Sequence, residues 1–270
     1  MITISRKEGM NMNLELLECV IENNIALVSL NRPPYNPLNW NLFSELSQLM
    51  DELEENPLVR AVIITGKGNR AFAAGADIRD MMDLNASDIL ANNEKCRATF
   101  LKMERLSKPI VAAVNGLALG GGAELTLACD VRICSDTAKF GFPEINLGII
   151  PGAGGTQRLQ RIVSQTVAKE LLYFGEMITA KRAYEIGLVN KVVPLESLLN
   201  EAKEWALKLA EKPAIAMRMM KLSVNSGAKV DLDSALDLEL ACFGNTFATE
   251  DRKEGMQAFI EKRKAKFQGK

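Results

Sequence analysis

The 270-residue sequence contains no histidine, and this absence excludes several kinds of enzyme. Without an imidazole there is no Ser-His-Asp or Cys-His catalytic machinery and no histidine-ligated metal site. Cysteine is scarce as well: five residues are scattered along the chain, and none forms a C-x-x-C pair. This spacing argues against a disulfide framework or a zinc ribbon. It favours small, buried, free thiols in a reducing compartment.

The chain also lacks an excess of either charge. Lys and Arg number 33 and Asp and Glu number 34, so the formal net charge is −1. Such a balance gives no electrostatic attraction for nucleic acid or for an acidic membrane surface. The longest apolar run, residues 110–123, is interrupted by polar and glycine residues and is shorter than the ~20 residues of a spanning helix. The N-terminus has no apolar signal segment, so we expect a cytoplasmic protein.

Hydrophobic patterning predicts an α/β protein with a helical C-terminal region. Strands are expected at 14–21, 25–30, 59–65, 110–114, 130–135 and 138–142. Helices are expected at 39–55, 79–107, 123–129, 156–163, 166–174, 180–186, 196–211, 213–226, 231–247 and 250–268. We therefore expect an N-terminal extension (1–13), a core that carries the site (14–200) and a helical region (201–270).

Three loops are expected to carry functional groups, because loops held by rigid strands often do so. They are residues 73–77, the glycine triplet 120–122, and residues 142–155. A glycine triplet at the start of a helix exposes backbone N–H groups that can hold a phosphate or a developing oxyanion. The alternative is that these glycines only allow close packing of a helix on a strand. A dinucleotide-binding fingerprint and a Walker lysine are both missing, which disfavours a nucleotide-dependent oxidoreductase.

Two glutamates stand in unusually apolar surroundings. Glu124 follows the glycine triplet within an apolar run, and Glu144 follows Phe142 and Pro143. Burial would raise the pKa of each carboxyl group, which suits general acid–base catalysis. Alternatively, Glu124 complements a helix N-terminus and Glu144 is an exposed acid in a turn. The pattern alone leaves both interpretations open.

Four blocks of sequence, at 71–78, 109–125, 140–145 and 148–159, resemble the enoyl-CoA hydratase (crotonase) family in sequence and in order. The resemblance extends from about residue 14 to the C-terminus and is strongest to bacterial short-chain enoyl-CoA hydratases. It implies a spiral of ββα units with a helical C-terminal region that trimerises, often as a dimer of trimers. It also implies reversible syn addition of water to a trans-2-enoyl-CoA, giving a 3-hydroxyacyl-CoA.

The resemblance assigns roles to individual residues by motif position. The backbone N–H groups of Ala76 and Gly121 would form an oxyanion hole for the thioester oxygen, and Glu124 and Glu144 would be the catalytic acids. The loop 74–78 would hold the adenine end of CoA, and Lys262 would reach a CoA phosphate, in some relatives that of a neighbouring subunit. The CoA- and substrate-binding residues implied in this way are Ala74, Ala76, Asp77, Ile78, Gly121 and Lys262. No metal is implied, and no cofactor other than the CoA of the substrate.

The sequence departs from the family pattern at two positions. Phe142 stands where many hydratases carry glutamine, and we expect it to raise the pKa of Glu144 or to alter the preference for acyl chains. Pro37 stands where alanine is usual, and it stiffens a segment near the expected entrance for CoA.

Two other functions remain as alternatives. Isomerases of this family usually lack one of the two glutamates, so the presence of both favours hydration over double-bond isomerisation. A non-catalytic protein that binds RNA or a partner enzyme would use the basic C-terminal cluster, Lys262, Arg263, Lys264, Lys266 and Lys270. That cluster is also typical of a solvated helix face or of a contact with CoA phosphate.

Overall fold

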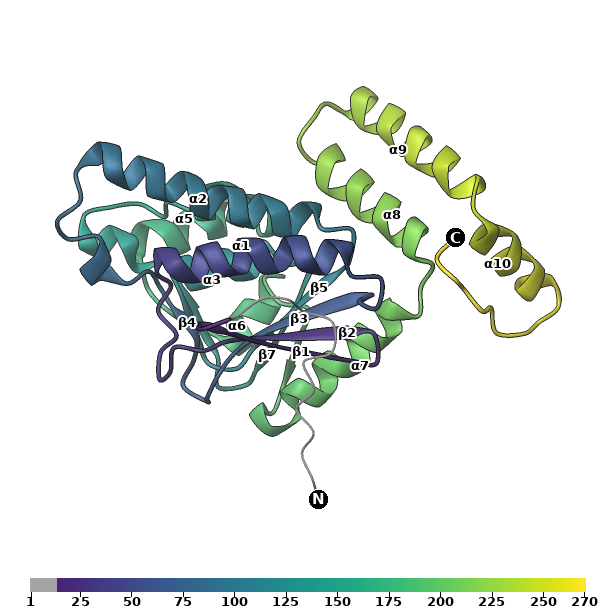
Figure 1. Ribbon diagram of the computed structural model, residues 1–270. Coiled ribbons are helices and arrows are strands. Elements are labelled where there is room, and N and C mark those ends of the chain that lie inside the picture. The colour runs from purple at the N-terminus through teal and green to yellow at the C-terminus, as the bar shows by residue number, and fades with distance from the viewer. Residues whose placement is uncertain (1–13) are drawn as a thin grey trace, which may run out of the picture.

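A six-stranded sheet forms the centre of the computed structural model, which describes residues 14–270 (Figure 1). Its strands, in spatial order, are β1 (Leu17–Glu22), β2 (Ile25–Leu30), β3 (Ala61–Gly66), β5 (Ile110–Val114), β7 (Val131–Ser135) and β10 (Lys191–Val193). Only β1 and β2 pair in antiparallel fashion, and the other neighbours are parallel. The central strands β3 and β5 are buried along their whole length, because both faces of the sheet are covered.

A second, four-stranded sheet carries the loops of interest. It consists of β4 (Ala71–Ala74), β6 (Leu117–Leu119), β8 (Lys139–Gly141) and β9 (Ile178–Thr179). Three times the chain passes from a strand of the first sheet to a strand of the second and then to a helix, which is the expected ββα spiral. Since β4, β6 and β8 are parallel neighbours, the segments that follow them emerge at the same edge of this sheet.

Helices cover both faces of the six-stranded sheet. The helices α1 and α2 lie side by side on the larger hydrophobic core, and α7 packs on the other face with Leu198, Ala202 and Ala206 (Figure 1). The helical elements of this part are α1 (Trp40–Glu55), η1 (Ile78–Asp80), α2 (Ala86–Arg105), α3 (Gly121–Leu127), η2 (Pro143–Leu147), α4 (Gly155–Ile162), α5 (Gln165–Phe174), α6 (Ala180–Glu185), η3 (Leu195–Ser197) and α7 (Leu198–Ala210).

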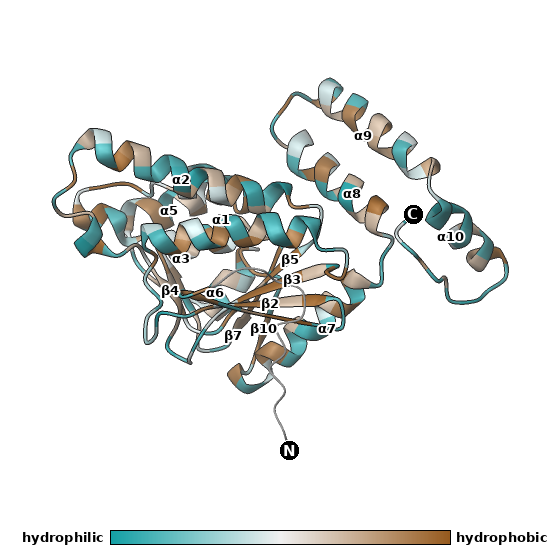
Figure 2. Cartoon of the chain, viewed as in Figure 1, coloured by the Kyte–Doolittle hydropathy of each residue, from teal (hydrophilic) through white to brown (hydrophobic). Residues whose placement is uncertain are grey.

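The last three helices extend away from the sheets as an arm (Figure 1). They are α8 (Ala214–Gly227), α9 (Leu232–Phe247) and α10 (Glu250–Ile260), and α8 packs against α9. Apolar and polar residues alternate along these helices (Figure 2). Leu232, Phe243 and Phe259 are among the large apolar side chains that the single chain leaves exposed.

The predicted α/β architecture is confirmed, with local corrections. Residues 71–74, expected in a loop, form β4, because pairing with β6 outweighs the weak strand preference of alanine. The predicted helix 79–107 begins only at Ala86, after the N-cap Asn85. The predicted helix 250–268 ends at Ile260, and Lys262 has a left-handed φ of 55°.

Two expectations about organisation stay predictions. The N-terminal extension 1–13 lies outside the described residues. The boundary at residue 200 falls within α7, which still packs on the sheet, and the chain leaves the core only after that helix. Within residues 14–270, no helix is both long enough and apolar enough to cross a bilayer.

Candidate active site

The amides of Ala76 and Gly121 come together because they follow paired strands. Ala74 of β4 lies opposite Leu119 of β6, so the chain leaves both strands at the same edge. The nitrogen of Ala76 lies 3.7 Å from the position that a Cβ atom on Gly121 would take. In residues 14–270 neither of these N–H groups donates a hydrogen bond to another backbone group. The two donors are thus adjacent and available.

A short parallel bridge with Leu38 orients the amide of Ala76. The N–H of Leu38 donates to the carbonyl of Gly75, and the N–H of Asp77 donates to the carbonyl of Leu38, each at 2.9 Å. In a parallel bridge the residues on either side of the bridged residue form the hydrogen bonds to the partner strand, and the N–H of the bridged residue itself points away from that strand. The N–H of Ala76 therefore points away from Leu38. Gly75 permits the sharp turn that this geometry requires, with a φ of +89°.

The glycine triplet packs closely on β4 and also leaves a backbone N–H group available. A Cβ on Gly122 would lie 2.0 Å from the carbonyl oxygen of Ala73, so α3 contacts β4 backbone to backbone. Gly120 has a φ of +49° and starts the helix, which leaves the N–H of Gly121 in its first turn without a helical partner. Close packing and the exposed donor therefore arise from the same segment.

Glu124 is fully buried on α3, and its carboxylate is held at one oxygen. Oε1 accepts hydrogen bonds from the N–H of Ala153 at 2.9 Å and of Gly155 at 2.7 Å. Oε2 lies 3.9 Å from the Cβ position of Gly121, beside the amide pair. Burial raises the pKa of Glu124, while the two N–H groups and the charge of Arg158 oppose that rise. One oxygen is therefore fixed and the other faces the site.

Glu144 lies on η2, at the opposite side of the same glycine segment. Its Oε1 is 2.6 Å from the position that a Cβ on Gly120 would take, and its buried Oε2 has no hydrogen-bond partner in the described chain. Burial, with a smaller contribution from the charge of Glu124, raises the pKa of Glu144 to about 7. The two carboxyl groups therefore interact across Gly120 and Gly121.

These positions decide between the alternatives for the two glutamates. Glu144 is not an exposed acid in a turn, because its Oε2 is buried. Glu124 does accept from the amides that begin a helix, but the helix is α4 rather than its own. The structure thus places Ala76, Gly121, Glu124 and Glu144 around one space, where their catalytic roles stay predictions.

Comparison with known proteins identifies the family and the fold. The family model for enoyl-CoA hydratase/isomerase matches residues 20–270. The chain belongs to this family. It is 46% identical over 247 residues to the crotonyl-CoA hydratase of Syntrophomonas wolfei, covering 91% of this chain and 95% of the relative. It is 45% identical over 261 residues to the short-chain-enoyl-CoA hydratase of Clostridium acetobutylicum, covering 94% and 97%.

Solved structures of the family agree with this assignment. The enoyl-CoA hydratase of Bacillus anthracis superimposes with a TM-score of 0.91 at 41% identity, covering 95% of this chain and all of that one. An enoyl-CoA hydratase from Geobacillus kaustophilus gives a TM-score of 0.93 at 33% identity, covering 96% and 98%. The predicted crotonase-like fold is therefore confirmed.

The residues expected to bind CoA are only partly brought together. In the loop 74–78, Ile78 is exposed and Asp77 forms an ion pair with Arg32 at 3.1 Å. Lys262 follows α10, which lies away from β4 in Figure 1, so one chain does not bring this lysine beside the loop. The CoA-binding roles of Ala74, Ala76, Asp77, Ile78, Gly121 and Lys262 stay predictions.

The two departures from the family pattern occupy distinct environments. Phe142 is fully buried in the main hydrophobic core. The carbonyl oxygen of Pro37 accepts a hydrogen bond from Arg32 Nη1 at 2.6 Å, which joins this proline to the arginine paired with Asp77. Their expected effects on Glu144, on acyl-chain preference and on CoA binding stay predictions.

Sequence reasoning missed the groups that hold Glu124. The donors are backbone amides of Ala153 and Gly155, which carry no side-chain signal, and the only hint was the glycine-rich break before α4. Sequence reasoning also did not predict that Nη1 of Arg158 donates to the carbonyl of Ala153, in the same loop. In residues 14–270 we find no group of three or more acidic or cysteine side chains arranged to hold a metal ion.

Proposed function

We propose that this protein adds water reversibly, with syn geometry, across the 2,3 double bond of a trans-2-enoyl-CoA. The product is a 3-hydroxyacyl-CoA, so the protein is a hydro-lyase. The observation that carries the proposal is the placement of the buried Glu124 carboxyl group and the half-buried Glu144 carboxyl group beside two available backbone amides. The hydratases among its relatives support the same reaction.

The amides of Ala76 and Gly121 would stabilise the charge that the reaction develops. Attack of water on the conjugated double bond moves negative charge onto the thioester oxygen, as an enolate. Two N–H donors that point at this oxygen stabilise the charge when bulk water is excluded from the site. Loss of one such donor typically raises the activation free energy by about 3–4 kcal/mol. The adjacency of these amides supports this role.

The two glutamates would move the protons. Glu124, with Oε1 fixed and Oε2 facing the site, would hold the water and take its proton. Glu144, with a pKa of about 7, would deliver a proton to the α-carbon. During the addition one proton passes from Glu144 to the α-carbon, and another passes from the water to Glu124. The two glutamates therefore hold one proton between them both before and after the reaction.

The pH dependence follows from that shared proton. Hydration needs Glu124 ionised and Glu144 protonated, and we expect kcat/KM to fall above a pKa of about 7 as Glu144 ionises. Dehydration needs the other arrangement of the one shared proton, with Glu124 protonated and Glu144 ionised. The rate of dehydration should therefore fall at alkaline pH in the same way. Rates measured in both directions from acid to alkaline pH test this. A hydration rate that rises through neutral pH would contradict the proton assignment.

A panel of enoyl-CoAs of increasing chain length tests the proposed function. The expected result is loss of the conjugated absorbance with a product heavier by one water, fastest for short chains such as crotonyl-CoA. A product of unchanged mass with a displaced double bond would instead support the alternative, an enoyl-CoA isomerase. The presence of both Glu124 and Glu144 favours hydration, because water addition needs both a base and an acid.

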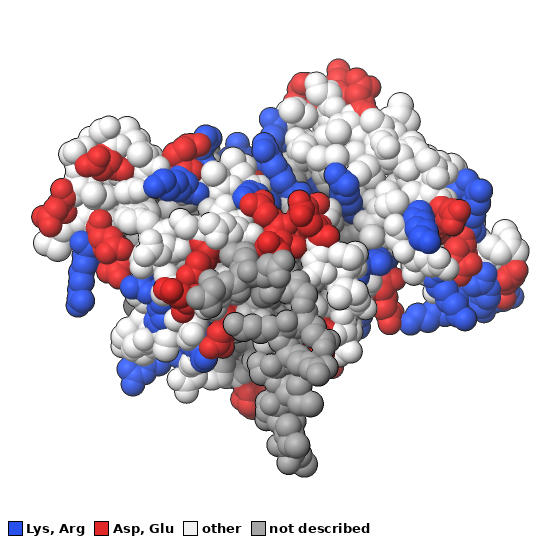
Figure 3. Space-filling model, viewed as in Figure 1, with Lys and Arg blue, Asp and Glu red and all other residues white. Residues whose placement is uncertain are grey.

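RNA binding by the C-terminal basic cluster is disfavoured by its surroundings. Arg263 forms ion pairs with Glu254 and Glu261, and Lys264 pairs with Glu211. Basic and acidic side chains are correspondingly intermixed at this end of the molecule (Figure 3). Their charges largely cancel, so the cluster offers little net attraction for phosphates.

The reaction as written needs no cofactor beyond the CoA of the substrate. A cytoplasmic location is supported by the five cysteines, all of which are free thiols.

We also propose a trimer, or a dimer of trimers, built through the helical arm. The exposed apolar side chains of α9 and α10, such as Leu240 and Phe259, support this because burying them would be favourable. Sedimentation equilibrium should give a particle of three or six chains. A monomer at micromolar concentration would contradict the proposal.

A further inference from the structure

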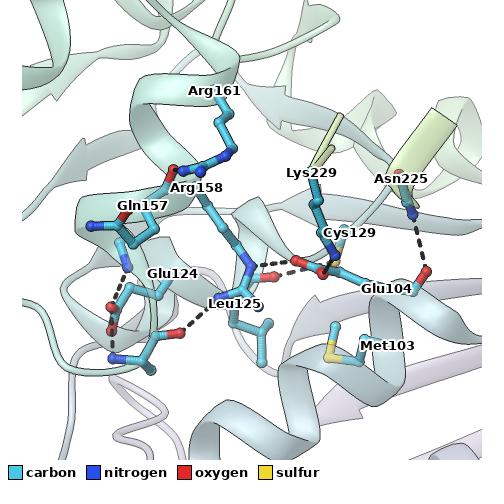
Figure 4. A network of polar contacts seen from close by, with 12 residues as sticks. Met103, Glu104, Glu124, Leu125, Cys129, Gln157, Arg158, Arg161, Asn225 and Lys229 are labelled. Atoms are coloured by element: carbon cyan, nitrogen blue, oxygen red, sulfur yellow. Dashed lines mark hydrogen bonds and ion pairs between the residues drawn. The ribbon is translucent and has the colours of Figure 1, made fainter. Parts of the chain in front are cut away.

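A polar network behind Glu124 connects the site to the helical arm (Figure 4). Its centre is Arg158 on α4, whose guanidinium forms an ion pair with Glu104 on α2 and donates through Nη1 to the carbonyl of Ala153 at 2.8 Å. Ala153 in turn donates its N–H to Glu124 Oε1 at 2.9 Å. A single residue, Ala153, therefore links Arg158 to the glutamate.

We infer that Arg158 is a positioning residue for Glu124: with Glu104 as its anchor, it holds the 153–155 loop whose amides fix the carboxylate. The inference rests on the proposed function, in which Glu124 is the base. In residues 14–270 no hydrogen bond or ion pair joins Arg158 to Glu124, so Arg158 positions the carboxylate through the loop, while its charge also acts on Glu124 through space.

The loop needs such a support because of its own geometry. Gly154 has a φ of +112°, and Nη1 of Arg158 lies 2.0 Å from the position that a Cβ there would take. The guanidinium therefore fills the space over Gly154 and lies against the loop. The ring of Phe100 packs 5.8 Å from the guanidinium carbon, so the arginine is confined on a second side.

The anchor of Arg158 is itself fixed by the arm. Glu104 Oε2 accepts from Lys229 at 3.0 Å, and the carbonyl of Glu104 accepts from Asn225 at 3.0 Å. One turn earlier, the buried Lys221 donates to the carbonyl of Met103. The spacing of four residues places these three side chains on one face of α8 and its continuation. They join α8 to the end of α2, next to the arginine.

The pKa of Glu124 provides a measurement that distinguishes a positioning role of Arg158 from a contribution to the stability of the fold alone. The charged and titratable groups that interact with Glu124 are Arg158 on α4, Glu144 on η2 and Cys96 on α2. Arg158 is the cation among them, and it lowers the pKa of Glu124 against the effect of burial. Removing this charge should raise the pKa of Glu124.

Arg158→Met, Arg158→Lys and a control, Arg161→Met, test the inference. Arg161 is an exposed arginine on the same helix, and within residues 14–270 its side chain bonds only to the carbonyl of Gln157 in α4. For Arg158→Met we expect kcat for crotonyl-CoA to fall by up to about 100-fold, the scale for a misplaced group, with KM nearly unchanged. Arg158→Lys keeps the charge and should be intermediate, and Arg161→Met should match the wild type.

A carbon-13 NMR titration of Glu124, assigned through Glu124→Gln, adds a measurement that does not depend on turnover. The expected result is a higher pKa of Glu124 in Arg158→Met and a wild-type pKa in Arg158→Lys. If Glu124 in folded Arg158→Met titrates as in the wild type, the inference is overturned, even if the variant is less stable. A wild-type protein that does not hydrate crotonyl-CoA would overturn the proposed function, while the titration would still decide the role of Arg158.

Discussion

Replacing Glu124 with glutamine should lower hydration of crotonyl-CoA by about 100- to 10,000-fold, the usual contribution of a general base. The amide has nearly the shape of the carboxylate, and its oxygen can still accept from Ala153 and Gly155. It cannot take a proton from water at neutral pH. The loss should therefore appear in kcat, measured from the conjugated absorbance, rather than in KM.

Stability should move in the opposite direction. Burial raises the pKa of Glu124 above its value in the unfolded chain. At pH values above the unfolded pKa, ionisation of Glu124 therefore lowers the stability of the folded protein. The neutral amide removes that cost, and the unfolding temperature of Glu124→Gln at neutral pH should be no lower than that of the wild type. The exposed Glu204 offers a control, since Glu204→Gln makes the same chemical change away from the site. Wild-type turnover in Glu124→Gln would refute the assignment.

Alanine at Gly121 and at Gly122 should give opposite phenotypes. At Gly121 a Cβ would meet Leu38 Cδ1 at 3.5 Å and the nitrogen of Ala76 at 3.7 Å, which are ordinary contacts. The methyl group would nevertheless lie close to both the amide of Ala76 and Oε2 of Glu124 and would occupy space beside the two donors. We expect a normally folded protein whose kcat/KM is lower by about 100- to 1,000-fold, as for the loss of an oxyanion donor.

At Gly122 the added methyl group has no room. Its Cβ would lie 2.0 Å from the carbonyl oxygen of Ala73, so α3 would have to move away from β4. Overpacking of this kind destabilises by about 1–3 kcal/mol. Thermal unfolding together with kcat/KM separates the two variants. A Gly121→Ala protein that is fully active would show that the thioester oxygen does not bind between these amides.

Sequence patterns predict the elements whose burial is decided locally. The continuous apolar runs of β3 and β5 indicate buried strands, and the predicted bounds 110–114 match β5. The strands β4 and β6 are short, β4 is rich in alanine, and both form because they pair with each other. Their small side chains allow α3 to approach closely, which is a tertiary requirement that a strand propensity does not express.

The site was predictable to the extent that side chains form it. Glu124 and Glu144 stand out as carboxylates in apolar sequence, and both are perturbed by burial. The amides of Ala153 and Gly155 could not be assigned to Glu124, because any residue type supplies an N–H. Arg158 fits an ordinary amphipathic helix in sequence, and only the fold brings it to Glu104.

Hydration of crotonyl-CoA in deuterium oxide tests the central claim most directly. In the proposed reaction the two glutamates add a hydroxyl group from water and a proton from Glu144 to the same face of the double bond. The predicted product is the 3-hydroxy thioester with a single deuterium at C2, placed syn to the new hydroxyl group. NMR of the product shows this placement. An anti product, or a thioester that gains no hydroxyl group, would contradict the account.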